Sequence, residues 1–306
     1  MKKALSVILA VAMLLSFFAT AAFAVSYDRP FYSGAYGSKT YRIPALYTLN
    51  DGSVFALADK RHESGLDSPA NIDIVYAISP DGYTGWEYTT LNHFDDYADG
   101  VTSTKSASFI DSAVVQSSTG RLFVVSDTFP SGGGSDYSSK GTGFDEIDGV
   151  NRMLLTKGKA TDNLRTFGYY IGDFENSFAP VLTRDSSAAT EYSVDGEYNL
   201  YKNGEPLYTS QKGSEGVSVQ QNVYYSDSEL CCYRTSYLWL RYSDDNGKTW
   251  SSPVNLTAFV KHDNETFLGI CPGRGFITTV NGTERIIFCV YDNQGIRLNV
   301  STIYSD

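Results

Sequence analysis

The stretch Ser243-Asp244-Asp245-Asn246-Gly247-Lys248-Thr249-Trp250 decides the fold, because its residue types are those that build a tight turn between two strands. Asp245 can accept hydrogen bonds from the backbone amides that follow it, and Gly247 supplies a positive φ without steric cost. Trp250 is expected to pack beneath the turn. The pattern Ser-x-Asp-x-Gly-x-Thr-Trp has five fixed positions in eight residues, so it is a specific signal.

A second copy of this motif stands at Ser79 to Trp86, with its glycine one place early and an additional glycine at Gly85. A third copy would begin at Ser305. Repeated turns between strands predict a radial or stacked β repeat, most simply a propeller of four-stranded blades. Trp86 and Trp250 are separated by several times the roughly 40 to 50 residues of one blade, so additional material must interrupt the array.

Short apolar or alternating runs recur along the chain and predict strands. No stretch after residue 24 keeps an apolar period of 3.6 over three turns. The 23 tyrosines and 17 phenylalanines suit half-buried strand faces. We therefore predict an all-β chain. The polar stretch 161–233 contains hairpin-like pieces such as Val194-Asp195-Gly196-Glu197 and is predicted to be a β-rich insertion.

The stretch 41–67 brings two arginines to one edge of the predicted sheet. Pro44 favours extended backbone before it, which places Arg42 near the start of a strand. The apolar run 54–58 reads as a second strand that follows a tight turn and ends just before Arg61. Antiparallel strands joined by a tight turn bring these two ends together, so both arginines are predicted on one rim.

Two guanidinium groups beside a carboxyl group suit a small acidic ligand. A planar guanidinium can hold a carboxylate through two hydrogen bonds, while a nearby acid moves a proton. Asp67 and Glu63 are the candidate acids in the polar segment after Arg61. The alternative is that Arg42 and Arg61 are ordinary surface residues in weak ion pairs.

The N-terminal segment predicts export. Lys2 and Lys3 precede the apolar run 4–18, and Ala22-Phe23-Ala24 has the Ala-x-Ala form of a signal peptidase site. We predict cleavage after Ala24, a secreted protein and no membrane insertion, because the apolar run is too short to span a bilayer. The formal net charge of −11 argues against nucleic acid or an anionic membrane as a partner.

The four cysteines are Cys231, Cys232, Cys271 and Cys289. Their spacing matches no zinc-binding pattern, and neither a metal nor another cofactor is predicted. Adjacent cysteines rarely bond to each other without strain, so bridges from Cys231 or Cys232 would run to Cys271 or Cys289. Partly buried free thiols are the alternative.

Arg-Ile-Pro at 42–44, the Arg61 and Asp67 pair and the turn motifs together resemble the bacterial sialidases, whose fold is a six-bladed propeller. The likeness extends through most of the chain, in Ser108-Phe109-Ile110-Asp111-Ser112, Phe129-Pro130-Ser131-Gly132-Gly133-Gly134, Glu146-Ile147-Asp148-Gly149, Tyr198-Asn199-Leu200-Tyr201-Lys202-Asn203-Gly204 and Phe267-Leu268-Gly269-Ile270-Cys271-Pro272-Gly273. These segments look like the large clostridial-type enzymes and their intramolecular trans-sialidase relatives, which carry a β-rich insertion between blades.

The resemblance implies a role for each matching residue. Arg42 would be the first of three arginines that bind the carboxylate of sialic acid, and Arg61 would contact the O4 region of the sugar. Asp111 would bind near the N-acetyl group and O4. Asp67, and not Glu63, matches the catalytic acid/base of the family. The pocket wall would include Ile110 and Phe129.

The implied activity is removal of terminal sialic acid from glycoconjugates with retention of configuration. The nucleophile would be a tyrosine where ordinary glycosidases use a second carboxylate. A neutral tyrosine approaches a carbon beside a carboxylate with less charge repulsion than Asp or Glu would meet. This tyrosine needs a glutamate base nearby, and Asp67 must hold a proton to assist the leaving group.

In the family, the glutamate and tyrosine pair and the other two arginines belong to later blades, beyond the point that corresponds to Asp306. We therefore expect residues 25–160 to form the first blades and 234–306 to form further blade structure after the 161–233 insertion, with the chain ending inside the propeller. An intramolecular trans-sialidase is a close alternative activity. A noncatalytic propeller that binds sialylated glycans, or an inactive fragment, is a second alternative.

Overall fold

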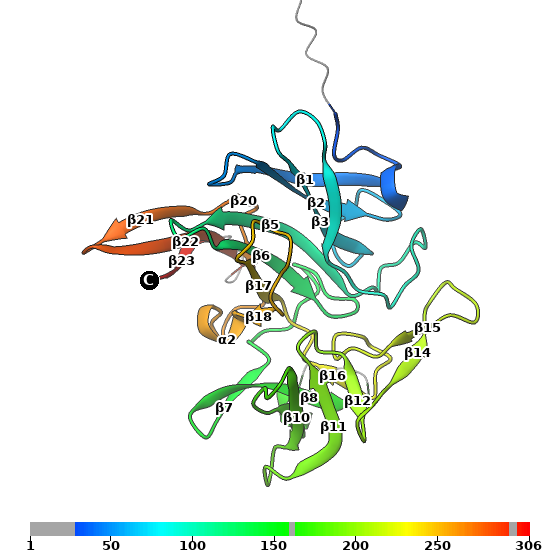
Figure 1. Ribbon diagram of the computed structural model, residues 1–306. Coiled ribbons are helices and arrows are strands. Elements are labelled where there is room, and N and C mark those ends of the chain that lie inside the picture. Colours follow the sequence, from blue (N-terminus) through cyan, green and yellow to red (C-terminus); the bar gives the residue numbers. More distant parts are fainter. Residues whose placement is uncertain (1–27, 159–162, 294–298) are drawn as a thin grey trace, which may run out of the picture.

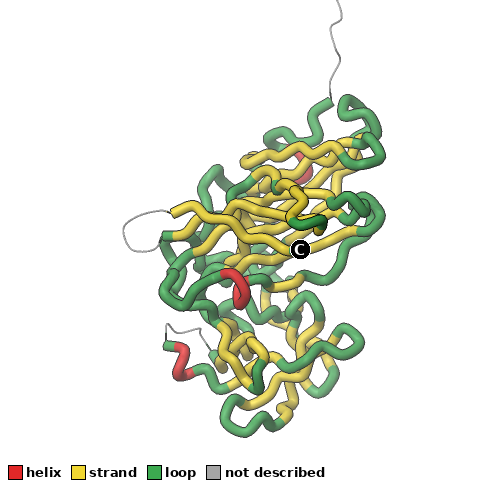
Figure 2. The backbone as a smooth tube through the Cα atoms, turned by 90° about the vertical axis from the view of Figure 1, so that its left-hand side faces the viewer, coloured by secondary structure: helices red, strands yellow, loops and turns green. Residues whose placement is uncertain are grey.

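The computed structural model describes residues 28–158, 163–293 and 299–306. The predicted signal peptide, residues 1–24, lies outside the described residues. The fold is all-β, as predicted, with three short helical segments in the described part: η1 (Ala35–Gly37), η2 (Leu164–Thr166) and α2 (Thr257–Val260). None of the described helices is long and apolar enough to cross a membrane. Figures 1 and 2 show three sheets above a separate β-rich lobe.

The first two sheets are each built around four antiparallel strands. The first consists of β1 (Thr40–Thr48), β2 (Val54–Arg61), β3 (Ile72–Ser79) and β4 (Glu87–Asn92). The second contains β5 (Ser108–Gln116), β6 (Leu122–Phe129), β17 (Tyr237–Ser243) and β18 (Val254–Asn255), and β20 (Gly273–Arg274) joins the free edge of β5 in parallel. The third consists of β19 (Leu268–Ile270), β21 (Phe276–Val280), β22 (Thr283–Asp292) and β23 (Asn299–Ser305), with β22 paired on both edges.

The separate lobe fills the interval between β6 and β17 of the second sheet (Figure 1). In its main sheet the strand order is β13-β12-β11-β10-β9-β8-β16, with β7 paired to β8, and β14 and β15 form a hairpin. The strands are β7 (Phe144–Ile147), β8 (Val150–Lys157), β9 (Tyr169–Ile171), β10 (Phe178–Thr183), β11 (Ala189–Asp195), β12 (Leu200–Lys202), β13 (Glu205–Pro206), β14 (Tyr208–Ser210), β15 (Ser218–Gln220) and β16 (Leu230–Cys232).

The main sheet of the lobe begins at Phe144, earlier than the insertion predicted for 161–233. The difference arises because β7 and β8 pair with each other and with β9 and β16, and not with strands of the second sheet. The apolar run of β8 looks the same in sequence whether it belongs to a blade or to the lobe. Its pairing partners decide between the two, and these are distant in the chain.

The first copy of the turn motif forms a closed network of hydrogen bonds. Asp245 Oδ1 accepts from the backbone N–H groups of Lys248 and Thr249 at 3.0 and 2.9 Å, and Oδ2 accepts from Thr249 Oγ1 at 2.6 Å. These bonds, with the Thr249 hydroxyl foremost, lower the pKa of Asp245 to about 2. Ser243 Oγ accepts from the Gly247 amide at 2.8 Å. The aspartate therefore organises the turn, as predicted.

The second copy forms the same turn with one residue fewer. Asp81 Oδ1 accepts from the Thr84 amide at 2.9 Å, and Ser79 Oγ accepts from the Gly82 amide at 2.9 Å. Each bond spans three residues here and four in the first copy. The additional Gly85, with φ of 64°, restores the length before the tryptophan. The altered spacing is thus a one-residue deletion with a compensating insertion.

Trp250 joins the second sheet to the first. Its ring lies 6.1 Å from that of Phe55 and 5.7 Å from that of Tyr76, measured between centroids. The Tyr76 hydroxyl donates to the carbonyl of Gly247 at 2.8 Å. The turn of the second sheet thereby packs against the apolar layer between the first and second sheets. The prediction that Trp250 packs beneath the turn is confirmed.

None of the four cysteines, all of which lie in the described part of the chain, forms a disulfide bond. Cys231 and Cys232 are buried in β16 of the lobe. Cys271 and Cys289 lie in the region of the third sheet, where the Cys271 amide donates to the Cys289 carbonyl at 2.9 Å. Of the two predicted alternatives, the structure therefore has the thiols. No disulfide joins Cys231 or Cys232 of the lobe to Cys271 or Cys289.

The contact of the turn with the first sheet predicts the effect of Gly247→Ala. A Cβ at this position would lie 3.1 Å from Ile78 Cδ1 and 3.2 Å from Phe55 Cε2. We expect the free energy of unfolding to fall by about 2 to 4 kcal/mol in a urea titration, from left-handed backbone strain plus overpacking. Gly52→Ala is the matched control, because Gly52 has the same φ of 87° and no atom near its Cβ position.

Gly52→Ala should lower the free energy of unfolding by about 1 kcal/mol, the strain of the backbone alone. Equal losses in the two variants would show that the turn does not press on the first sheet.

Candidate active site

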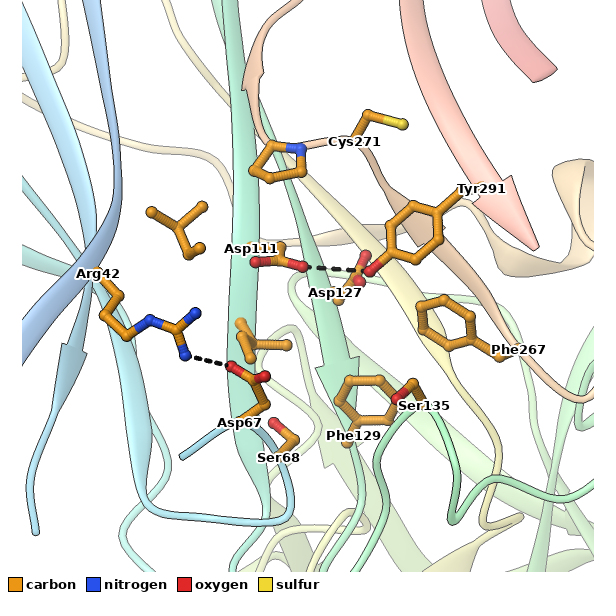
Figure 3. A pocket seen from close by; sticks show the side chains of 13 residues that line it. Arg42, Asp67, Ser68, Asp111, Asp127, Phe129, Ser135, Phe267, Cys271 and Tyr291 are labelled. Carbon is orange, nitrogen blue, oxygen red and sulfur yellow. Dashed lines mark hydrogen bonds and ion pairs between the residues drawn. The ribbon is translucent and has the colours of Figure 1, made fainter. Parts of the chain in front are cut away.

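A cavity of about 300 Å³ opens where the first, second and third sheets meet. Figure 3 shows side chains from all three sheets pointing into it. The lining residues are Arg42, Ile43, Asp67, Ser68, Ile110, Asp111, Asp127, Phe129, Ser135, Phe267, Cys271, Pro272 and Tyr291. Because no single sheet supplies the site, its geometry depends on how the sheets pack.

Two irregular positions aim charged side chains into this cavity. The pairing of β1 with β2 shifts after Arg42, and that of β5 with β6 shifts after Ile110. Ile43 and Asp111 occupy the shifts with φ of 54° and 50°. This left-handed region is unfavourable for a β-branched residue such as Ile43. Bulges of this kind redirect side chains next to active sites, and here they turn Arg42 and Asp111 toward the same space.

Arg42, Arg61 and Asp67 form one ion-paired group. Asp67 Oδ1 lies 2.9 Å from Arg42 Nη1 and 2.6 Å from Arg61 Nη1. The side chain of Asp67 is 64% exposed, whereas that of Arg61 is 1% exposed. Arg61 therefore supports Asp67 from behind, and Arg42 shares the cavity with it. Both arginines also donate to the carbonyl of Gly65, which fixes the loop that carries Asp67.

Asp59 is a buried carboxyl group that the sequence did not indicate. Its Oδ2 accepts from Arg61 Nη2 at 2.9 Å, and its Oδ1 accepts from the backbone amide of Asp111 at 3.1 Å. Burial raises the pKa of Asp59 to about 8, against the opposing effect of the Arg61 guanidinium. The side chain of Asp59 thus orients Arg61 of the first sheet and the bulge at Asp111 of the second sheet.

Tyr291 reaches the cavity from the third sheet. Its hydroxyl donates to Asp111 Oδ2 at 3.3 Å (Figure 3). Burial raises the pKa of Tyr291 well above its ordinary value, and burial also raises the pKa of Asp111. The tyrosine therefore acts as a hydrogen-bond donor that helps to hold Asp111 in place.

Asp127 lies on the floor of the cavity and is fully buried. Its Oδ1 accepts from the Ile270 amide at 2.7 Å, while its Oδ2 has no hydrogen-bond partner among the described residues. A Cβ at Gly269 would lie 2.5 Å from that Oδ2 atom, so only glycine fits there. Burial raises the pKa of Asp127 well above its ordinary value. Burial therefore favours the neutral carboxyl group of Asp127 over its carboxylate.

Apolar side chains form the remaining wall. The rings of Phe129 and Phe267 are nearly parallel, at 13°, with centroids 6.1 Å apart. With Ile72 and Ile110 they belong to one buried apolar cluster beneath the cavity. This wall forms the apolar face of the cavity, opposite the charged groups of Arg42 and Asp67 (Figure 3).

Five of the six residues predicted for the site line the cavity, and the sixth, Arg61, stands behind Asp67. The structure does not bring Glu63 into it. Glu63 Oε1 instead accepts from the backbone amides of Asn71 and Ser103 at 3.3 and 3.1 Å. Within the described residues, no group of three His, Cys, Asp or Glu side chains is arranged to hold a metal ion.

Sequence reasoning missed Asp59, Asp127, Tyr291 and Phe267. Asp127 could have been found, because it is the one charged residue in the stretch 122–129, which begins with four apolar residues. Nothing in the local sequence distinguishes Tyr291 from the other tyrosines.

The glycine-rich loop 131–135 completes the rim. Ser131 Oγ donates to Asp96 Oδ2 at 2.7 Å, and two further donors bond the same buried carboxyl group. Burial raises the pKa of Asp96 to about 6. A Cβ at Gly134 would lie 2.4 Å from the carbonyl oxygen of Ser68. The glycine therefore lets this loop pass directly beside the segment that carries Asp67.

No protein-family model matches the chain. In sequence it is similar to an anhydrosialidase of Macrobdella decora, with 33% identity over 304 residues that cover 90% of this chain and 39% of that protein. It is also similar to sialidase B of Streptococcus pneumoniae, with 30% identity over 82% of this chain and 38% of that protein. The chain thus spans about two fifths of the length of these curated relatives.

Two solved structures are similar over almost the whole chain. The intramolecular trans-sialidase of Ruminococcus gnavus matches with a TM-score of 0.79 and 32% identity, over 91% of this chain and 63% of that one. A leech intramolecular trans-sialidase matches with a TM-score of 0.80 and 30% identity, over 93% of this chain and 46% of that one.

The buried Asp96 predicts a dependence of stability on pH. Its pKa in the folded protein lies above that of an unfolded chain, so the stability it contributes is complete below about pH 4 and is lost as pH rises through about 6. Between about pH 4.5 and 7.5 we expect Asp96→Asn to lose about 2 kcal/mol less stability than the unaltered protein, in which Asp59, with its pKa of about 8, contributes a further loss of the same sign. Urea titrations at the two pH values measure it.

Asp95→Asn is the matched control, because Asp95 is the neighbouring aspartate and its side chain is exposed. It should keep the pH dependence of the unaltered protein. The same dependence in Asp96→Asn would contradict the assignment.

Proposed function

This chain belongs to the sialidase family, and on that premise we propose that it forms the sugar-binding and proton-transferring part of a glycosidase that removes terminal sialic acid from glycans. The observation that carries the proposal is the convergence of Arg42, Asp67 and Asp111 on one cavity. These three side chains come from two sheets and a loop, and only the assembled fold brings them together.

Arg42 is proposed to bind the carboxylate of the sugar. Its Nη1 atom already holds a carboxylate oxygen, that of Asp67, at 2.9 Å. A ligand carboxylate would take over this bond in the bidentate geometry that a guanidinium favours. Asp67 would then keep only its bond to Arg61, at 2.6 Å, and become available at the mouth of the cavity.

Asp67 is proposed to be the general acid. The proton on its carboxyl group moves to the glycosidic oxygen while the bond from the anomeric carbon to that oxygen breaks. The positive charge that develops on the sugar is offset by the sugar's own carboxylate, which Arg42 fixes in place. Asp111 is oriented by the hydroxyl of Tyr291 and by the hydrogen bond that its own backbone N–H donates to Asp59. Its carboxyl group would accept hydrogen bonds from the N-acetyl N–H or the O4 hydroxyl of the sugar.

The retaining mechanism of the family also needs a tyrosine nucleophile with a glutamate base. Tyr291 does not meet this requirement, because its hydroxyl donates to Asp111 and burial raises its pKa. No glutamate is among the described residues that line the cavity. The chain is therefore assigned the acid and the carboxylate-binding arginine, and no residue of it is assigned as nucleophile.

We further propose that the first two sheets are blades of a six-bladed propeller. Their four-stranded antiparallel order and the shared turn motif support this. Export through the predicted signal peptide at residues 1–24 belongs to the same proposal, since sialylated glycans are extracellular substrates.

An intramolecular trans-sialidase is the second candidate. The similarity of the whole fold to two intramolecular trans-sialidases favours it. In that reaction a hydroxyl of the same sugar, instead of water, would attack the anomeric carbon, so that an anhydro sugar is released. Both candidates share the roles of Arg42 and Asp67 and differ only in the acceptor.

The role of Asp67 predicts the behaviour of Asp67→Ala with a fluorogenic sialoside. We expect release of the fluorophore to fall by at least about 100-fold, the usual contribution of a general acid. Asp244→Ala is the matched control, because Asp244 is 61% exposed and paired with Arg121 on the surface. It should leave the release unchanged. Mass spectrometry of the product separates free sialic acid from the anhydro sugar.

Binding of a sialoside without any release would support the noncatalytic alternative. Release that persists in Asp67→Ala would contradict the assignment of the acid.

A further inference from the structure

A second cavity is lined by the same loop that borders the first. It has a volume of about 640 Å³ and is lined by residues 136–140, Tyr233, Arg234 and Asp263. We name it the side groove. Ser135 lines the active-site cavity and Asp136 lines the side groove, so consecutive residues of one loop border both. Tyr137 of the side groove also lies near the segment that carries Asp67, because its amide donates to the Gly134 carbonyl at 3.0 Å and Gly134 packs against the Ser68 carbonyl.

The side groove lies on the side of the active site from which a leaving group would depart. Gly134, just before it, packs against the Ser68 carbonyl, which follows Asp67 directly. If Asp67 protonates the glycosidic oxygen, that oxygen lies next to Asp67. The remainder of the glycan, which is attached to this oxygen, then extends out of the cavity near Asp67. The surface it meets there is the loop that runs from Gly134 to Tyr137.

The lining of the side groove suits a neutral sugar. Tyr137 is 60% exposed and offers an aromatic face with a hydroxyl at its edge, a combination that can pack on the C–H face of a pyranose and bond its hydroxyls. The formal charges of Asp136 and Asp263 balance those of Lys140 and Arg234. The groove therefore lacks the excess of positive charge that would select a second acidic sugar.

Hydrogen bonds hold the walls of the side groove in place. The Tyr137 amide donates to the Gly134 carbonyl at 3.0 Å, and the Ser139 amide donates to the Arg234 carbonyl at 2.7 Å. The Tyr233 hydroxyl donates to the Lys140 carbonyl at 2.9 Å. A loop held in this way loses little freedom on binding, which lowers the entropic cost of recognition.

We propose that the side groove is a subsite for the neutral sugar of the leaving glycan, with Tyr137 as its platform. This inference rests on the proposed function, because it takes its direction from Asp67 as the acid. It also gives the lobe a part in recognition. Tyr233 and Arg234 follow β16 directly and lead back to β17, so the return of the insertion supplies one wall of the groove.

Saturation-transfer NMR with two ligands tests the proposal. The ligands are the α-methyl glycoside of N-acetylneuraminic acid and 3′-sialyllactose, which share the acidic sugar and differ in the neutral one. With the unaltered chain, we expect saturation of the lactose protons as well as those of sialic acid, and binding of sialyllactose several-fold tighter than of the methyl glycoside by calorimetry.

Tyr137→Ala should remove the saturation of the lactose protons and the difference in affinity, while binding of the methyl glycoside stays unchanged. Tyr137→Phe keeps the ring and should retain most of both effects. Tyr208→Ala is the matched control, because Tyr208 is 59% exposed and lies in β14 of the lobe, outside the side groove. It should behave as the unaltered chain does.

Three results would overturn the inference, and they separate it from the proposed function. If sialic acid protons are saturated and lactose protons are not, the subsite is wrong and the proposed function stands. If Tyr137→Ala keeps the lactose signal, the sugar lies elsewhere. If neither ligand binds, the proposed function fails and the subsite fails with it.

Discussion

The carboxyl group of Asp59 is the constraint on which the site depends. It bonds the guanidinium of Arg61 within the first sheet and the amide of Asp111 within the second, so it ties two sheets together directly beneath the cavity. Both Asp59 and Arg61 are almost fully buried. Loss of either partner would leave buried polar atoms unsatisfied, at about 1 to 3 kcal/mol each. This polar contact in an otherwise apolar layer sets the alignment of the two sheets, and Arg61 transmits that alignment to Asp67.

Local strain is the other condition for the site. Ile43 and Asp111 both have left-handed backbone inside strands, a conformation that costs about 1 to 3 kcal/mol at each non-glycine position. Regular strands would point Arg42 and Asp111 away from their present directions, because side chains alternate between the faces of a sheet. The apolar layers on either side hold the strained segments. Packing distant from the cavity, including that of Trp250 on the first sheet, thus determines the direction of the side chains in it.

The distance along the chain between two contacting residues explains which contacts could be predicted from the sequence. The hydrogen-bond partners of Asp245 lie within four residues of it, so the turn could be predicted from the local sequence. The strands and the Arg42 rim follow from equally local patterns. In contrast, the contacts of Asp59 with Asp111, of Asp127 with Ile270 and of Tyr291 with Asp111 span 52, 143 and 180 residues. The start of the lobe at Phe144 was missed for the same reason, because strand pairing over long distances leaves no local mark.

The charges of the cavity connect binding to proton transfer. Burial raises the pKa of Asp59 to about 8 and also raises the pKa of Asp111 and Asp127, so each of these buried carboxyl groups favours its neutral form more than a carboxyl group in water does. Asp67 differs from them, because it is exposed and its Oδ1 atom lies between Arg42 and Arg61. On the proposed function, a ligand carboxylate would take the place of Asp67 on Arg42 in the bidentate geometry that a guanidinium favours. The same event that fixes the sugar would thus free the acid that acts on its leaving group.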